Sequence, residues 1–515
     1  MTVDGELIRI PYNQQSTALS AVFDEAHDSQ PSDPHTEHPH FHPSITAEIY
    51  DTQYGKRSIG TIGGMCLLIN NCLGPGLVQM NGQMQLSGWL PTIAAIGFFG
   101  TLAFASCWML MYAQSRVKSA LTRVEFTGIC EYFFSRPLFL FSILFYVLTM
   151  IVQCISGIQQ TMQLMDLLIV RLFGKSCALE IYPDFFSTPC GSSDGGFSVF
   201  EAGSGVVTLG FVASALIAIP FGFFPLEDSI IFQIISCAIM AICLVLLSVD
   251  LSLIGFEPDR LPAVGSSMSG LVGLMMFNFS LAFSLPSWNN ERKLEVRVKR
   301  SIGGSIIIGS ITMLIIGVVA ALAFAPSLGS DKNLIDVANG SDRALTIASV
   351  YIFSLANNIT TIPVFSIMIR YTLLEHKILR KPWVANLLAI ALPWLLVIPF
   401  STGSGFDMII EFGGSVFIGV TCFVAPPVLF LCALRPKWLF RNDEAEQSTG
   451  AVTREMTEDV EKNDCLGASN ELNGFTDPQF PEIEGKKHKD RMSFGTLAIL
   501  GALSASLIYS WYSSV

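Results

Sequence analysis

Charged residues are scarce in this 515-residue sequence, at 14%, compared with roughly 25% in an ordinary soluble protein. A soluble fold of this length needs more polar surface, because only one side of each surface helix is hidden from water. Apolar residues reach 51%, and the mean hydropathy is +0.52. This composition excludes a soluble enzyme, a disordered protein and a nucleic-acid binder, and it indicates a polytopic membrane protein.

The sequence also lacks a Cys-x-x-Cys pair among its twelve cysteines, so it gives no support for a zinc or redox motif. Cys177 and Cys190 lie in one polar loop and could form a disulfide if that loop faces an oxidising compartment. No catalytic constellation stands out, so we expect neither an enzyme nor a resident cofactor or metal.

The acidity is confined to the two ends of the chain. Residues 1–57 carry nine acidic and three basic side chains, and residues 435–492 carry thirteen and nine, so these segments supply −6 and −4 of the net −12. We expect a disordered cytosolic tail over 1–57, a membrane core over 58–434, a cytosolic linker over 435–492 and a last span with a short C-terminus over 493–515. Four histidines between residues 34 and 43 could bind a metal or sense pH, or belong to a solvated tail.

Long apolar runs dominate the rest of the chain. Because a spanning helix needs about 20 apolar residues, the sequence predicts an all-α protein with about eleven transmembrane helices and no competing strand pattern. The expected spans are 59–80, 88–113, 138–172, 203–224, 229–254, 266–288, 301–325, 344–374, 383–400, 407–434 and 493–513.

Lys and Arg predict the orientation, because they concentrate in cytosolic loops. They gather in loops 114–136, 289–300 and 375–382 and after residue 434, which places the N-terminus in the cytosol. The sequon at Asn339 then lies outside, where glycosylation is expected. The lipid bilayer is the expected partner. The plasma membrane and a vacuolar or lysosomal membrane are both compatible with the sequence. The sequence leaves the oligomeric state open.

The first span is interrupted at its centre by Asn70, Asn71 and then Gly74-Pro75-Gly76. Pro75 has no N–H and disfavours a helical Gly74, and two Asn in an apolar run are costly without partners. An unwound segment with exposed peptide groups is the favoured interpretation; a simple proline kink with packed glycines is the alternative.

The sixth span carries a second discontinuity, marked by Asn278, Ser280, Ser284 and Pro286. Interrupted helices at matching positions of two inverted five-helix repeats indicate a transporter site at mid-membrane. The expected substrate-binding residues are Asn71, Gly74, Pro75, Gly76, Leu77, Phe279, Ser280, Phe283 and Ser284.

The eighth span contains a third polar patch, Asn357-Asn358-Ile359-Thr360-Thr361. Its Thr hydroxyls could contact an ion, or they could bond back to the preceding helical turn.

Four stretches in order resemble the amino acid/auxin permease family, whose animal members include the sodium-coupled neutral and the proton-coupled amino acid transporters. They are Asn70 with Gly74-Pro75-Gly76, Phe277 through Trp288 with Val298-Lys299-Arg300-Ser301, Thr361-Ile362-Pro363-Val364 with Arg370, and Phe412-Gly413-Gly414-Ser415 through Ala425-Pro426-Pro427. The sixth span departs from the pattern of some members, having Ala282 and Ser284 instead of a His-Pro-Glu stretch, and no Leu-Pro-Tyr follows Leu77. These departures leave the substrate and the coupling ion open.

The resemblance implies a leucine-transporter-like fold of two inverted five-helix repeats with helices 1 and 6 broken. It further implies a secondary active transporter that moves amino acids by alternating access, coupled to Na⁺ or H⁺. The ion-binding residues would be Asn70, Thr360 and Thr361. The absence of ionisable residues at both breaks favours small neutral amino acids. The alternative is an amino-acid-sensing receptor that signals through its long acidic tail with little flux.

Overall fold

The structure is a computed structural model that describes residues 2–3, 6–7, 57–117, 124–182, 187–191, 205–223, 226–293, 295–324, 333–341, 343–375, 381–402, 405–434, 480, 489–501 and 503. The chain divides into two units, Met1–Gln53 and Tyr54–Val515. In the first, strands β1 (Thr2–Val3) and β2 (Glu6–Leu7) form a short antiparallel pair. The histidine-rich stretch and most of the linker 435–492 lie outside the described residues.

The second unit is a helical bundle, as the apolar runs predict. Eight helical spans in the described residues are long and apolar enough to cross a membrane, and a bent pair makes a ninth. Two of these nine are the interrupted spans described below, and the set confirms an all-α, multi-pass membrane architecture. In chain order the principal elements are α3 (Thr61–Cys72), η2 (Pro75–Gln79), α4 (Met80–Ser87), α5 (Trp89–Gln114), α6 (Phe126–Phe133), α7 (Arg136–Phe173), α8 (Leu209–Phe221), α9 (Leu226–Ser252), η3 (Pro258–Arg260), α10 (Leu271–Asn278), η4 (Ala282–Ser284), α11 (Leu285–Glu291), α12 (Val298–Ala323), α13 (Leu334–Asn339), α14 (Ala344–Glu375), α15 (Pro382–Leu396), η6 (Ile398–Phe400), α16 (Gly405–Gly413), the π-helix η7 (Gly414–Val424) and α17 (Ala425–Leu434).

Two of the predicted spans are only partly matched. The fourth is the shorter apolar helix α8, of 13 residues. The eleventh is helical over residues 489–501, and most of its remaining residues are not described.

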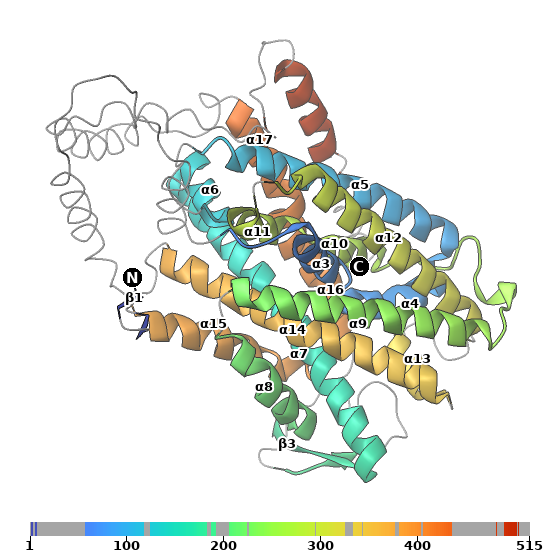
Figure 1. The fold of residues 1–515 in the computed structure, drawn as a ribbon. Helices are drawn as coiled ribbons and strands as arrows, with labels where there is room; N and C mark the ends of the chain where they lie inside the picture. Colours follow the sequence, from blue (N-terminus) through green and yellow to red (C-terminus); the bar gives the residue numbers. More distant parts are fainter. Residues whose placement is uncertain are drawn as a thin grey trace, which may run out of the picture. The chain divides into compact units, whose positions relative to one another are not determined.

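The interrupted helices occupy the middle of the bundle. In Figure 1, α3 and α10 lie among the long helices α5, α9, α12 and α14. α3 contacts α9 and α12, while α10 contacts η2, α16 and η7. The apolar stretch of the span Leu271–Glu291 is completely buried, whereas the apolar stretches of the other long spans are only partly buried. Outward-facing aliphatic side chains such as Leu216 and Ile231 are more than 60% exposed on the surface of the bundle, as expected for helices that face lipid.

A small sheet lies between α7 and α8, where the sequence pattern gave no strand. β3 (Ser176–Tyr182) pairs antiparallel with β4 (Cys190–Gly191) and with β5 (Gly205–Thr208). The predicted span 203–224 therefore starts too early, because residues 205–208 are a strand and Thr208 caps α8 by accepting a hydrogen bond from the Phe211 amide. Asp166 adds a second cap, accepting from Ser176 Oγ at 2.7 Å and from the Gly210 amide at 2.8 Å.

The first span also extends further than predicted, since α4 continues to Ser87 where an outer loop was expected. α4 is polar, and its side-chain amides donate to backbone carbonyls of neighbouring segments. Gln85 Nε2 donates to the carbonyls of Ala321 and Phe324 at 2.9 and 3.0 Å. An apolar-run criterion misses such a helix because burial among other helices, rather than lipid, stabilises it.

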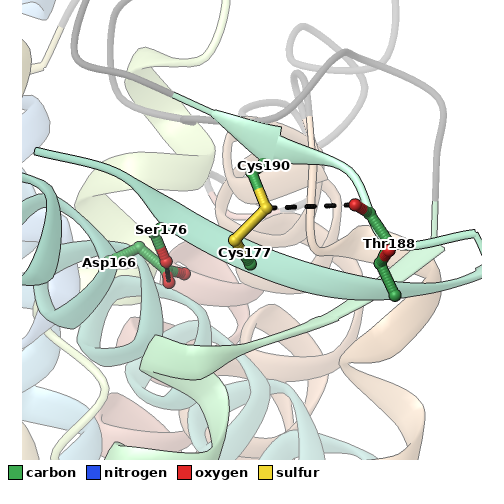
Figure 2. Close-up of a disulfide and its surroundings, with 5 residues drawn as sticks. All are labelled: Asp166, Ser176, Cys177, Thr188 and Cys190. Atoms are coloured by element: carbon green, nitrogen blue, oxygen red, sulfur yellow. Dashed lines mark hydrogen bonds between the residues drawn. A yellow bond between two sulfur atoms is a disulfide. The ribbon is translucent and has the colours of Figure 1, made fainter.

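The disulfide joins two strands at the end of the bundle. Cys177 and Cys190 are directly paired across β3 and β4 and are bonded through their sulfurs. Figure 2 shows this bond beside Ser176, which points toward Asp166 on α7. The bond therefore fixes the strand pair next to the residues that cap α8.

Cys177→Ser, Cys190→Ser and the double variant should lower the free energy of unfolding equally, by roughly 2–4 kcal/mol, because each removes the same cross-link of 13 residues' separation. Thermal unfolding of the purified protein measures this. Reduction should release two maleimide-reactive thiols in the wild type and none in the double variant. Labelling of both thiols before reduction would contradict the cross-link.

Candidate functional site

The first break follows directly from the local sequence. α3 ends at Cys72, Gly74 is extended with φ −68° and ψ −156°, and η2 starts at Pro75. Pro75 cannot donate to the carbonyl four residues before it, so the helix cannot continue through this point. The two halves of the span meet at an angle of 45°. This angle is larger than the gentle curvature of a continuous helix and agrees with an interrupted one.

The second break lies between α10 and α11. α10 ends at Asn278, residues 279–281 are not helical, and the 3-10 turn η4 leads into α11. Pro286 sits in the first turn of α11, where its missing N–H costs little. The interruption therefore precedes the proline by several residues and falls on the polar Asn278–Ser280 stretch.

The two breaks lie against each other. A Cβ atom on Gly76 would come closer than 3.0 Å to Asn278 Oδ1, and one on Gly64 would do the same to Trp288 Nε1. Asn71 Nδ2 donates to Ser284 Oγ at 3.0 Å. Glycine at positions 64 and 76 thus permits close approach of the two interrupted helices, and the Asn71–Ser284 bond joins them across the breaks.

A chain of amides connects the first break to α9 and α14. Asn70 Nδ2 donates to Gln233 Oε1 at 2.6 Å and to the Gln233 carbonyl at 3.0 Å. Gln233 Nε2 in turn donates to the Thr360 carbonyl at 2.9 Å. The predicted ion-binding residues Asn70 and Thr360 are therefore brought close together, with the Gln233 amide between them.

The second break is connected to α7 in a similar way. Gln153 Nε2 donates to Ser280 Oγ at 2.7 Å, and Tyr146 Oη donates to the Phe283 carbonyl at 3.4 Å. Two turns further along α7, Gln160 Oε1 accepts from Asn358 Nδ2 at 2.9 Å. α7, α9 and α14 thus surround the two breaks with neutral polar side chains.

Several buried oxygen acceptors in this region are left without a hydrogen-bond donor in the described part of the chain. They are the side-chain carbonyl oxygens of Asn70, Asn71 and Asn278, on residues at most 6% exposed. An unsatisfied buried amide group costs about 1–3 kcal/mol. A ligand that supplies donors or positive charge would remove this cost, and hard neutral oxygens suit an ammonium group or a small cation.

Full charges lie away from the breaks. Among the described residues, the charged side chains that are more than nine-tenths buried are Asp166, Asp250, Glu291 and Arg292. Asp250 accepts two bonds at 3.1 Å from Arg343 Nε at the start of α14, and Arg292 Nη1 donates to the Val296 carbonyl at 3.2 Å. These groups stabilise helix ends, so the junction of the breaks is polar and, among the described residues, holds no fully buried charge.

Most of the predicted substrate-binding residues meet at the junction of the breaks. Asn71, Ser280 and Ser284 make the bonds given above, and Pro75, Gly76 and Leu77 are buried at the start of η2. Phe279 is an exception, because its ring lies close to Gly100 of α5, whereas the Phe283 ring meets Phe365 of α14 edge-on, with 5.6 Å between ring centres.

The two predicted threonine ligands bond back to their own helix. Thr360 Oγ1 and Thr361 Oγ1 both donate to the Asn357 carbonyl, at 2.9 and 3.0 Å. This is the helical back-bond that the sequence leaves open as an alternative. Each hydroxyl oxygen retains lone pairs that could coordinate a cation, so the ion-binding role of Thr360 and Thr361 stays a prediction. Asn339, the predicted glycosylation residue, accepts a bond from Tyr351 Oη at 3.2 Å and also remains a prediction.

Sequence reasoning missed the amides on the surrounding helices. Gln153, Gln160 and Gln233 are each at most 3% exposed and bind atoms of the breaks or of α14. The sequence could have indicated them, because a Gln inside an apolar span needs a hydrogen-bond partner within the bundle. The identity of each partner could not be predicted, since it lies on another helix.

Gly76→Ala should destabilise the protein by about 1–3 kcal/mol through overpacking against Asn278, while Gly74→Ala should be tolerated because its Cβ would meet only the Asn71 carbonyl at 3.9 Å. Gly76→Ala/Asn278→Ala should recover part of the lost stability. Thermal unfolding of detergent-purified protein tests all three variants. Equal effects of the two glycine substitutions would contradict the close approach of the breaks.

Comparison with known proteins does not add a family assignment. No family model and no curated protein matches the sequence. The structure of an Eremococcus coleocola manganese transporter bound to an aromatic bis-isothiourea compound matches with a TM-score of 0.46 and 13% identity, covering 94% of this chain and 98% of that chain. Mhp1, a nucleobase-cation-symport-1 family transporter in a closed conformation with bromovinylhydantoin bound, matches with a TM-score of 0.45 and 14% identity, covering 88% and 95%. A likeness this distant assigns neither a family nor a substrate to this chain.

Proposed function

We propose that the protein is a secondary active transporter of small neutral amino acids that works by alternating access. One observation carries the proposal: two helix breaks lie against each other in the buried centre of a multi-pass bundle, with polar groups that lack donors. Interrupted backbone at membrane depth is tolerated only where protein or a ligand satisfies it, and paired breaks of this kind form substrate sites in transporters.

Peptide groups at the breaks suit the two charged ends of an amino acid. The backbone amides of Gly74 and Ser280 donate to no backbone carbonyl in the described residues, and they could bind a carboxylate. The carbonyl of Asn71, which Pro75 leaves without its helical donor, and the Asn71 side-chain oxygen could accept from an ammonium group. Both ends of a zwitterion would thus find neutral partners, consistent with an uncharged centre.

The Asn70–Gln233–Thr360 chain supports an ion site beside the substrate. Asn70 Oδ1 lacks a donor within the described residues, and the carbonyl of Thr360 and the hydroxyl of Thr361 lie on the adjacent helix α14. In this proposal Na⁺ displaces the Gln233 amide from the Thr360 carbonyl and is held by neutral oxygens. A proton is the alternative coupling ion, with Glu411, which lies against Gly270 at the start of α10, as its carboxylate.

Polar contacts at the two ends of the bundle provide gates. At one end the segment before α3 is hydrogen-bonded to the segment after α11, from the Ile59 amide to the Glu291 carbonyl at 3.0 Å and from the Lys293 amide to the Ile59 carbonyl at 2.9 Å. At the other end Gln163 of α7 donates to the Ser401 carbonyl at 3.3 Å. Alternating access would open one of these sets of bonds while the other holds. The proposal places the N-terminus in the cytosol, as the basic loops predict.

Reconstituted wild-type protein should accumulate small neutral amino acids when a sodium or a proton gradient is imposed, each tested separately in liposomes. Asn70→Ala and Thr361→Ala should abolish the dependence on sodium, reducing sodium-driven uptake by about tenfold or more, since each removes an oxygen ligand worth on the order of 1.5–3 kcal/mol.

Thr312→Ala is the matched control, because Thr312 makes the same helical back-bond on α12 at the exposed surface of the bundle. It should transport as the wild type does. Absence of gradient-driven uptake across the whole panel of amino acids would overturn the proposed function; unchanged sodium dependence in both site variants would overturn only the ion assignment.

A further inference from the structure

Asn357 on α14 differs from the other buried amides around the breaks. Its side chain is 1% exposed, and neither its Nδ2 nor its Oδ1 has a hydrogen-bond partner in the described part of the chain. The neighbouring Asn358 donates to Gln160, and Gln153 and Gln233 donate as described above. A fully buried amide without any partner is rare in native proteins, so Asn357 requires a partner that is not part of the described chain.

The position of Asn357 on α14 shows which way it faces. Successive helical residues are 100° apart. The carbonyl of Ala356 accepts a bond from Ser236 of α9, whereas Asn358 and Ile362 face α7, since Gly157 lies close to the Ile362 side chain. Asn357 falls on the arc between α9 and α7. The side opposite this arc carries Ile352, which is 49% exposed.

The same side of α14 also carries residues that connect this helix to the two breaks. Residues 357, 361 and 365 are four apart and line one stripe of α14, and the Phe365 ring contacts the Phe283 ring in the second break. Asn357 is three residues, about 4.5 Å along the helix axis, from Thr360, whose carbonyl connects through Gln233 to Asn70 of the first break. Asn357 therefore lies on the side of α14 that carries the contacts with both breaks.

A second group on this arc is also unpaired. Ser354, one turn before Asn357 on α14, is 2% exposed, and its Oγ has no partner within the described residues. Together the two side chains offer one N–H₂ group, one carbonyl oxygen and one hydroxyl. No charged side chain that is nine-tenths buried lies in this part of the described bundle, because all four such residues are at helix ends. A charged substrate side chain would be buried here without a counter-charge.

We infer that Asn357, together with Ser354, binds the side chain of the transported amino acid and selects a polar, uncharged group that both donates and accepts hydrogen bonds, namely a carboxamide or a hydroxyl. This inference rests on the proposed function. The breaks hold the carboxylate and ammonium ends that all amino acids share, so selectivity must come from the groups that face the substrate side chain. A site that hydrogen-bonds a polar substrate disfavours its apolar analogue, because the buried groups of the site are then left unpaired.

The test compares substrate selectivity in the full-length protein reconstituted in liposomes. Uptake of glutamine, asparagine and serine is measured against uptake of alanine, valine and leucine for the wild type and for Asn357→Leu, which keeps the number and branching of the side-chain heavy atoms and removes the amide. In the variant the kcat/KM ratio of polar to apolar substrates should fall by about tenfold or more, mainly through a higher KM for the polar substrates.

Asn358→Leu is the matched control, because it removes the same amide from the adjacent position, where it bonds to Gln160 on α7. It should reduce uptake of all substrates in proportion and leave the ratio unchanged. If Asn357→Leu does not fold, Asn357→Ser, which replaces the amide with a smaller hydroxyl, should shift the ratio in the same direction to a smaller extent.

The possible failures are distinguishable. An unchanged ratio in the Asn357 variants, or a wild type that carries only apolar amino acids, would overturn this inference and leave the proposed transporter standing. A wild type that carries none of the six amino acids under either gradient would overturn the proposed function itself and this inference with it.

Discussion

The peptide groups of a membrane-spanning chain must find hydrogen bonds inside the protein, because lipid offers none. The helical hydrogen bonds of the first and sixth spans are interrupted at Gly74-Pro75 and at residues 279–281. Neighbouring parts of the bundle supply other contacts at these positions. Glycines allow the two breaks to approach each other, Asn71 and Ser284 join them, and side-chain amides of two neighbouring helices, α7 and α9, bind their polar atoms. The side-chain oxygens of Asn70, Asn71 and Asn278 that remain without a donor in the described residues point to a ligand.

The same constraint explains the arrangement of polarity in the molecule. Charged side chains that are buried lie at helix ends, where capping and ion pairs stabilise them, as Asp166 does at the start of α8 and Asp250 beside Arg343. Neutral amides and hydroxyls occupy the middle, since an uncharged polar group costs less to bury than a charge. A centre of this kind is suited to a zwitterion or a cation held by neutral oxygens, and the lipid-facing surface remains aliphatic.

Much of the fold could be predicted because it depends on local sequence. Apolar runs predicted the spans, and Pro75 with its flanking glycines predicted the first break to within a residue or two. The second break was harder to place, since Pro286 starts α11 and does not cause the interruption. The polar helix α4 and the strand β5 escaped prediction because contacts with distant segments stabilise them. The candidate site follows the same division. The residues at the breaks were predicted, whereas Gln153 and Gln233 gain their significance from partners on helices far away in the sequence. Asn357 gains its significance from the lack of a partner in the described residues, which only the packing of the bundle shows.

The most direct measurement is an experimental structure of the protein in nanodiscs, determined by electron cryo-microscopy with and without a saturating neutral amino acid. The account predicts that helices 1 and 6 are interrupted at Gly74 and near Ser280 in both states, and that density for the amino acid lies between the two interruptions. Helices that run continuously through these positions, or an amino acid bound elsewhere with the junction of the breaks unchanged, would contradict it.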